Sequence, residues 1–260
     1  MWWFQQGMSA FPAFLVVWTA ASFLIPYVLA VLLRHVDPVV PYISDTGNVP
    51  PERCLFGIML NISTFLGVAT VYIRYKQVSS LNPDKSRILG INRLGLALGW
   101  MSCFGLCLIT NFQKCVLYSV HVLGAALTFG VGFLYLLLQT LLSFLTQPEL
   151  HGNSVLWARL AVSLWSCSSI ATMFVSSVLL ARDPQGPSLA QKLHWHPQDR
   201  GYTLHMISTV SEWSLAFSFL SFFLTYIRDF QEISLRAVVT LRGQRGLGAE
   251  EQQLLLPGSL

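Results

Sequence analysis

Six long apolar stretches run along the chain, and short segments richer in polar residues separate them. A helix needs about 20 mostly apolar residues to cross the hydrocarbon core of a bilayer. Each stretch meets this requirement, and together they cover residues 11–33, 54–73, 94–112, 117–144, 160–181 and 202–227. The pattern predicts an all-α fold: a polytopic membrane protein whose six transmembrane helices form a bundle.

The pattern also divides the chain into two regions. Residues 1–232 contain all six stretches and form the predicted transmembrane domain. Residues 233–260 become rich in Gly and Gln after Gly243. Because such a composition buries too little apolar surface to fold, we expect a largely disordered tail.

The composition agrees with a membrane protein. The chain is 53% hydrophobic and only 11% charged, with a mean hydropathy of +0.56, whereas soluble domains carry about 25% charged residues. So few charges cannot cover a water-facing surface. The net charge of +4 includes no long run of like charges, so we expect no nucleic-acid partner.

The loop charges predict the orientation. Ten Lys and Arg residues fall in the N-terminal segment and residues 74–93, 146–159 and 228–260, and six fall in the other loops. Cytoplasmic loops carry the excess of positive charge. Both termini are therefore expected in the cytosol, and the other loops in a lumen.

Polar residues recur on single faces of three predicted spans. Glu212 lies roughly 15 Å into the sixth span, where a charge is costly unless it faces protein or water. The candidate residues are His121, His205, Glu212, Asn61, Thr128 and Thr209. The simplest interpretation is helix packing through small and polar residues. The alternative is a luminal polar cavity that relays protons, binds a lipid headgroup or senses pH.

A catalytic interpretation is weaker. Two histidines and a glutamate could ligate zinc or perform acid–base hydrolysis, but no HExxH or GxSxG fingerprint accompanies them. We expect no catalytic residues, no metal and no cofactor. The five cysteines form no CxxC pair. Cys54 and Cys115 fall at the same membrane face and either pair in the lumen or remain free.

The tail carries a candidate sorting signal. An acidic residue, three spacers and two leucines form the general pattern of an acidic dileucine signal. The residues concerned are Glu250, Glu251, Leu254 and Leu255. A sorting adaptor would read such a pattern as a short extended peptide, with the carboxylate on a basic patch and the leucines in a pocket. The alternative is a merely solvated tail.

Several motifs resemble the damage-regulated autophagy modulator (DRAM) family. They are 1–7 (MWWFQQG), 41–47 (PYISDTG), 74–76 (RYK), 111–113 (NFQ), 192–195 (KLHW), 212–213 (EW) and 223–231 (FLTYIRDFQ). They span nearly the whole chain in the expected order. The second motif is the predicted luminal loop motif, with Pro41, Tyr42, Asp45 and Gly47 as its candidate functional residues.

The resemblance implies a six-span protein of lysosomal and late-endosomal membranes that promotes autophagy and is linked to cell death. It implies no established enzymatic activity. Our leading hypothesis is a non-enzymatic regulator whose partners are membrane lipids and cytosolic autophagy or sorting-adaptor proteins. The proteins would dock on residues 74–93 and the tail. The alternative is a lipid-handling or proton-linked transport protein that uses the luminal polar cavity.

Overall fold

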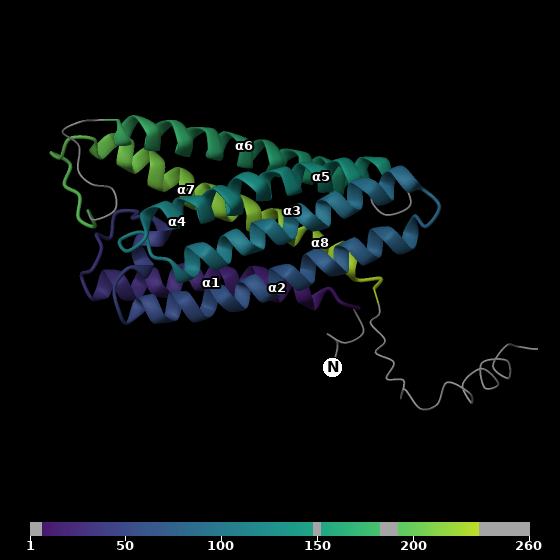
Figure 1. The fold of residues 1–260 in the computed structure, drawn as a ribbon, viewed down its shortest axis with the longest axis horizontal. Helices are drawn as coiled ribbons and strands as arrows, with labels where there is room; N and C mark the ends of the chain where they lie inside the picture. The colour runs from purple at the N-terminus through teal and green to yellow at the C-terminus, as the bar shows by residue number, and fades with distance from the viewer. Residues whose placement is uncertain (1–6, 148–151, 183–191, 234–260) are drawn as a thin grey trace, which may run out of the picture.

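The chain folds into an elongated helical bundle (Figure 1). The computed structural model describes residues 7–147, 152–182 and 192–233, and these residues form helices and loops without a strand. Six helices in the described residues are long and apolar enough to cross a membrane. The predicted all-α, six-span fold is therefore confirmed.

The elements follow one another in a simple order. They are α1 (Ala10–Leu32), the 3₁₀ helix η2 (Ile43–Gly47), α2 (Glu52–Leu81), α3 (Ser86–Asn111), α4 (Tyr118–Ala125), the π-helical turn η3 (Ala126–Val131), α5 (Gly132–Leu145), α6 (Asn153–Ala181), α7 (Tyr202–Leu224) and α8 (Tyr226–Phe230). The fourth span consists of α4, η3 and α5, and the sixth of α7 and α8.

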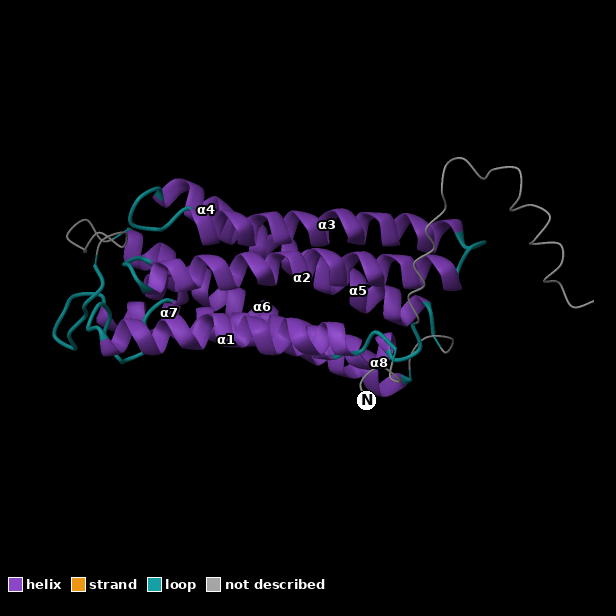
Figure 2. Cartoon of the chain, turned by 90° about the horizontal axis from the view of Figure 1, so that it is seen from below, coloured by secondary structure: helices purple, strands orange, loops and turns teal. Residues whose placement is uncertain are grey.

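Both described ends of the chain lie at one end of the bundle. The backbone N–H of Met8 contacts the carbonyls of Phe230 and Ile233 at 2.9 and 3.1 Å. We call this the terminal end. The opposite end carries the connections after α1, α3 and α6 (Figures 1 and 2), and we call it the loop end. The predicted tail lies outside the described residues from position 234 onward.

The helices are longer than the apolar stretches that predicted them. α2 continues to Leu81 and α3 begins at Ser86, so only residues 82–85 separate them. The predicted docking segment 74–93 is therefore mostly helix, and Arg74 within it is buried. The hydropathy pattern predicted that the second span ends before its first charged residue, Arg74. In the structure this residue has a buried partner inside the bundle.

Neighbouring helices pack closely where glycine allows it. A Cβ atom at Gly105 on α3 would lie 2.6 Å from the backbone nitrogen of Thr128 and 2.7 Å from the carbonyl oxygen of Gly124. A side chain there would separate α3 from α4 and η3. The packing role expected for small residues in membrane helices holds at this contact.

The outer surface of the bundle is apolar. Phe65, Phe174 and Leu164 are 76%, 65% and 64% exposed in the isolated chain. Side chains of this kind are stable on the outside only where lipid covers them. Polar and charged groups are instead collected inside the bundle and at its two ends.

Candidate functional site

Glu212 on α7 holds the first loop inside the loop end of the bundle. Its Oε2 accepts a hydrogen bond from the backbone N–H of Ile43 at 2.8 Å, and the indole of the next residue, Trp213, donates to the carbonyl of Pro41 at 2.8 Å. Non-helical backbone is tolerated at this depth only when protein surrounds it. Glu212 thus supplies the acceptor that a buried turn of η2 needs.

An ion pair fixes the same loop to the connection between α3 and α4. Lys114 Nζ donates to Asp45 Oδ1 at 2.8 Å and lies 4.3 Å from the centroid of the Tyr42 ring. Burial raises the pKa of Asp45, although the Lys114 ammonium opposes this effect. Burial alone lowers the pKa of Lys114, but the Asp45 carboxylate together with Tyr42 and Glu212 outweighs it and raises that pKa.

The end of η2 depends on Gly47. A Cβ atom at this position would lie 2.6 Å from the Phe56 ring on α2, so only glycine lets the loop settle against that helix. The structure places the four residues of the predicted loop motif in one buried turn: Pro41, Tyr42, Asp45 and Gly47. We call the segment 36–48 with Lys114 the cap.

The connection from α6 to α7, described over residues 192–201, packs over the cap, and we call it the third loop. The ring of His205 stacks on Trp195 with centroids 4.1 Å apart and meets the Tyr42 ring edge-on at 5.2 Å. Asp37 accepts hydrogen bonds from the Trp195 backbone N–H at 2.6 Å and the His194 ring at 3.0 Å. Burial alone would raise the pKa of Asp37, but these two hydrogen bonds lower it below its usual range.

Only some of the predicted polar residues come together. His121, Thr128 and Glu212 line a central cavity of about 140 Å³. His205 lines a separate cavity of about 200 Å³ beneath the third loop. The predicted cavity lined by both histidines and Glu212 is therefore wrong, because the cap's Tyr42 packs directly against His205.

The other two candidates have local partners. Asn61 exchanges hydrogen bonds with Asn111 at 3.1 to 3.2 Å, between α2 and α3. Thr209 is buried and donates to the carbonyl of Met206 at 3.1 Å. Neither side chain lines the two cavities described above. Both fit the packing interpretation of the polar stripes.

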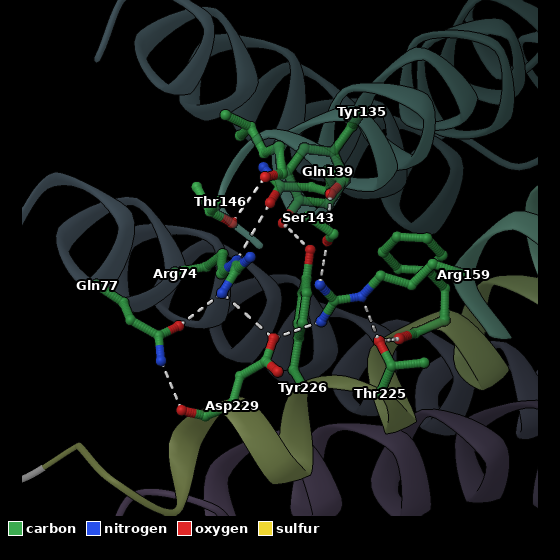
Figure 3. Close-up of polar contacts among 12 residues, drawn as sticks. Arg74, Gln77, Tyr135, Gln139, Ser143, Thr146, Arg159, Thr225, Tyr226 and Asp229 are labelled. Carbon is green, nitrogen blue, oxygen red and sulfur yellow. Dashed lines mark hydrogen bonds and ion pairs between the residues drawn. The ribbon is translucent and has the colours of Figure 1, made fainter. Parts of the chain in front are cut away.

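The sequence reasoning missed a buried charge cluster near the terminal end (Figure 3). Asp229 on α8 lies between two guanidinium groups: Arg74 Nη1 is 3.2 Å from its Oδ2, and Arg159 Nη2 bonds the same oxygen. Both arginines have an exposed fraction of 0%, and Asp229 has one of 6%. We call Arg74, Arg159 and Asp229, with the side chains that bond them, the charge cluster.

Neutral groups complete the hydrogen bonding of the two arginines. Arg74 Nε donates to Gln139 at 3.3 Å, while Arg159 donates to Ser143 at 2.5 Å and to Thr225 at 2.9 Å. These contacts join α2, α5, α6 and the junction of α7 with α8.

Aromatic groups enclose the cluster. The Tyr226 ring centroid lies 5.6 and 5.0 Å from the Arg74 and Arg159 guanidinium carbons. The Tyr226 hydroxyl lies 2.8 Å from that of Tyr135. Such rings favour cations through their π faces. The signal in the sequence was the pair of arginines at the margins of apolar stretches, which we counted as loop charges.

The described residues offer no obvious metal centre. No group of three His, Cys, Asp or Glu side chains among them is arranged to hold a metal ion. All five cysteines are free thiols, so Cys54 and Cys115 do not pair. His121 places its Nδ1 2.8 Å from the carbonyl of Phe112.

These features define a class: a six-span membrane bundle with a buried cap at one end and a buried charge cluster near the other. Residues 7–233 match the family model described as the Frag1/DRAM/Sfk1/Cwh43P N-terminal domain. The chain is 57% identical to DNA damage-regulated autophagy modulator protein 2 of Bos taurus, over 94% of this chain and 91% of that protein. Identity to the Homo sapiens protein of the same name is 54% over the same shares.

A second named relative is more distant. DNA damage-regulated autophagy modulator protein 1 of Homo sapiens is 40% identical over 92% of this chain and 98% of that protein. The chain therefore belongs to the damage-regulated autophagy modulator family. The predicted resemblance and the predicted class, an autophagy-modulating multi-pass membrane protein, are confirmed. No solved structure matches the chain.

Proposed function

We propose that this protein is a non-enzymatic modulator of autophagy in lysosomal and late-endosomal membranes. The observation that carries the proposal is the match over 94% of the chain to proteins named autophagy modulators. A more distant relative, named modulator of macroautophagy TMEM150B in Danio rerio, is 30% identical over 63% of this chain. The protein would act by binding cytosolic effectors rather than by converting a substrate.

The use of its polar groups supports a regulator over a hydrolase. Glu212 accepts the Ile43 N–H, and His121 contacts the Phe112 carbonyl. His205 stacks on Trp195. A hydrolase needs its acid, base and oxyanion donors around one reacting atom. Here each candidate serves a separate structural contact, so the arrangement favours a scaffold.

The charges at the terminal end support a cytosolic orientation for that end. Six spans put both termini on the same side. With the buried Arg74 and Arg159 removed from the ten positive residues and the buried Lys114 removed from the six, the loop-charge count is eight against five. The cap also suits the lysosomal lumen, because proteases cut exposed loop tips most readily and the cap is largely buried.

The docking surface for cytosolic proteins is smaller than the sequence suggested. Around the turn 82–85, the exposed basic side chains are Lys76, Lys85 and Arg87, with Arg93 further along α3. We propose that this basic turn, together with the tail, recruits autophagy or sorting-adaptor proteins. Membrane lipids cover the apolar faces of the helices.

A rescue experiment tests this proposal. Cells lacking the protein would receive either the full chain or a variant with Lys76→Glu and Arg87→Glu. The matched control reverses two exposed charges at the loop end, Arg34→Glu and Arg182→Glu. Autophagic flux, co-fractionation with lysosomes and protease accessibility of each end would be measured together, because moving charges can invert a membrane protein.

The expected result separates the two ends. The terminal-end variant reaches lysosomes in the normal orientation but restores little flux, while the control restores flux fully. If the terminal-end variant restores flux as well as the unaltered chain, the basic turn is not the docking surface. If the unaltered chain fractionates away from lysosomes, the proposed location is wrong.

A further inference from the structure

The central cavity is long and narrow. It runs inside the bundle between α1, α2, α3, α4, η3, α5 and α7. Its lining extends along α2 from Phe56 to Val71, and at 1.5 Å per residue this is about 22 Å. The lining encloses one continuous narrow cavity along this length, so it suits one slender occupant rather than a broad or branched one.

The wall of the cavity is apolar along most of its length. Two of its few polar side chains satisfy each other, because Thr19 donates to Ser63 at 3.0 Å. The hydroxyl of Thr128 is different: it is buried and has no hydrogen-bond partner among the described residues. A buried polar group without a partner is costly, so the protein alone does not fully satisfy this wall.

The polar end of the cavity lies against the cap. Glu212 uses Oε2 to accept the Ile43 N–H, and among the described residues no hydrogen bond or ion pair reaches its other oxygen. Lys114, the nearest ammonium group in the cap, bonds Asp45 instead. Glu212 therefore presents a carboxyl oxygen to the cavity without a matching donor.

We propose that this cavity binds one long apolar chain whose head donates hydrogen bonds, as an amine or a hydroxyl does, to Glu212. The length of the cavity exceeds one leaflet's share, about 15 Å, of a hydrocarbon core about 30 Å thick. In this proposal the single-chain amphiphile lies in the cavity with its apolar chain toward Val71 and Tyr135. Its head lies beside Glu212 and His121.

The head, rather than the chain, sets the selectivity. A lipid chain that leaves the bilayer for this cavity exchanges one apolar environment for another, so its burial discriminates little. Glu212 accepts hydrogen bonds from amines and hydroxyls and repels carboxylates. An ammonium group adds the attraction of an ion pair to its hydrogen bond with the carboxylate, whereas a hydroxyl brings the hydrogen bond alone. A long-chain amine therefore binds more tightly than the alcohol, and the fatty acid of equal length binds least.

Photolabelling of the purified full chain in lipid nanodiscs tests this assignment. The probes are three photoreactive single-chain molecules of equal length that end in an amine, an alcohol or a carboxylate. Labelled peptides are located by mass spectrometry, with the unlabelled long-chain amine and alcohol as competitors. The amine and alcohol should label peptides that line the cavity, and competition should remove this labelling. The carboxylate probe should label them at least about tenfold less.

Variants on both walls establish where the probe lies. Ala216→Phe on α7 and Ala125→Leu on α4 fill the cavity from opposite sides, and either should abolish competed labelling. Ala97→Phe is the matched control, because Ala97 is exposed on the outer face of α3, and it should leave labelling unchanged. Unfolded variants would be recognised by their loss of a single size-exclusion peak.

Glu212→Gln decides the case if neither filled variant folds. Glutamine keeps an acceptor for the Ile43 N–H but removes the charge, so amine labelling should fall about tenfold and alcohol labelling should fall less. Equal labelling by all three heads, labelling confined to outer-face peptides, or an unaffected Glu212→Gln variant would overturn the proposal. The readout is binding alone, so a negative result leaves the proposed autophagy function standing.

Discussion

Asp229 makes the stability of the bundle depend on one buried carboxylate. Replacing it with Ala leaves Arg74 and Arg159 buried without the anion that lies between them. Removing one partner of a buried ion pair costs about 3–5 kcal/mol, a large share of the roughly 5–15 kcal/mol that holds a typical protein folded. Asp229→Asn keeps an acceptor oxygen and loses only the charge, so it should cost about 2 kcal/mol.

Thermal unfolding of the purified protein in detergent measures these costs. For a chain of this size, about 3–5 kcal/mol corresponds to a fall in Tm of roughly 10 °C for Asp229→Ala. The control is Asp84→Ala, which removes an exposed carboxylate from the turn at the same end and should change stability by less than about 0.5 kcal/mol.

A second substitution distinguishes the lost charge balance from lost packing. Arg159→Met in the Asp229→Ala background removes one of the two uncompensated guanidinium groups, so it should recover part of the lost stability. Asp229→Ala unfolding at the same temperature as Asp84→Ala would refute the reasoning. A further loss of Tm in the double variant would show that Arg159 acts by packing rather than by charge.

The cap and the tail offer three shorter tests. Burial raises the pKa of Asp45, so its stabilising contribution is complete below about pH 3.9 and is lost as the pH rises through the folded-state pKa. Between about pH 3.9 and the folded-state pKa, Tm should therefore vary less with pH in Asp45→Asn than in the unaltered protein. An equal slope in the two proteins would contradict this prediction. Gly47→Ala should force the cap away from Phe56 and so speed protease cleavage at the loop end. Equal cleavage rates for the variant and the unaltered protein would contradict this prediction. Leu254→Ala with Leu255→Ala should raise surface biotinylation, whereas unchanged lysosomal residence would assign sorting to other segments.

Hydropathy was enough to predict the number and order of the spans. Each span must satisfy its own backbone hydrogen bonds in lipid, so a long apolar stretch is a strong signal by itself. The same hydropathy pattern assigned Arg74 and Arg159 to loops, because a charged residue marks the end of an apolar stretch. Their burial depends on Asp229, which is 155 residues from Arg74 along the chain, and no local pattern reports such a pairing.

The candidate site was predicted in part for the same reason. Helical spacing correctly put His121 and Thr128 on one face, and both line the central cavity. His205 shares a face with Glu212 by spacing, yet the cap lies against both residues, and the aromatic stack with Trp195 draws His205 under the third loop. The path of a non-helical loop into a bundle is set by tertiary contacts, which spacing does not encode.

The central claim is that this protein modulates autophagy without chemistry at its intramembrane polar groups. The most direct measurement is autophagic flux in cells lacking the protein that receive a Glu212→Gln and His121→Asn variant. Both substitutions keep a polar partner for the Ile43 N–H and the Phe112 carbonyl. The account predicts full restoration of flux at equal abundance and location. Loss of flux under those conditions would contradict it.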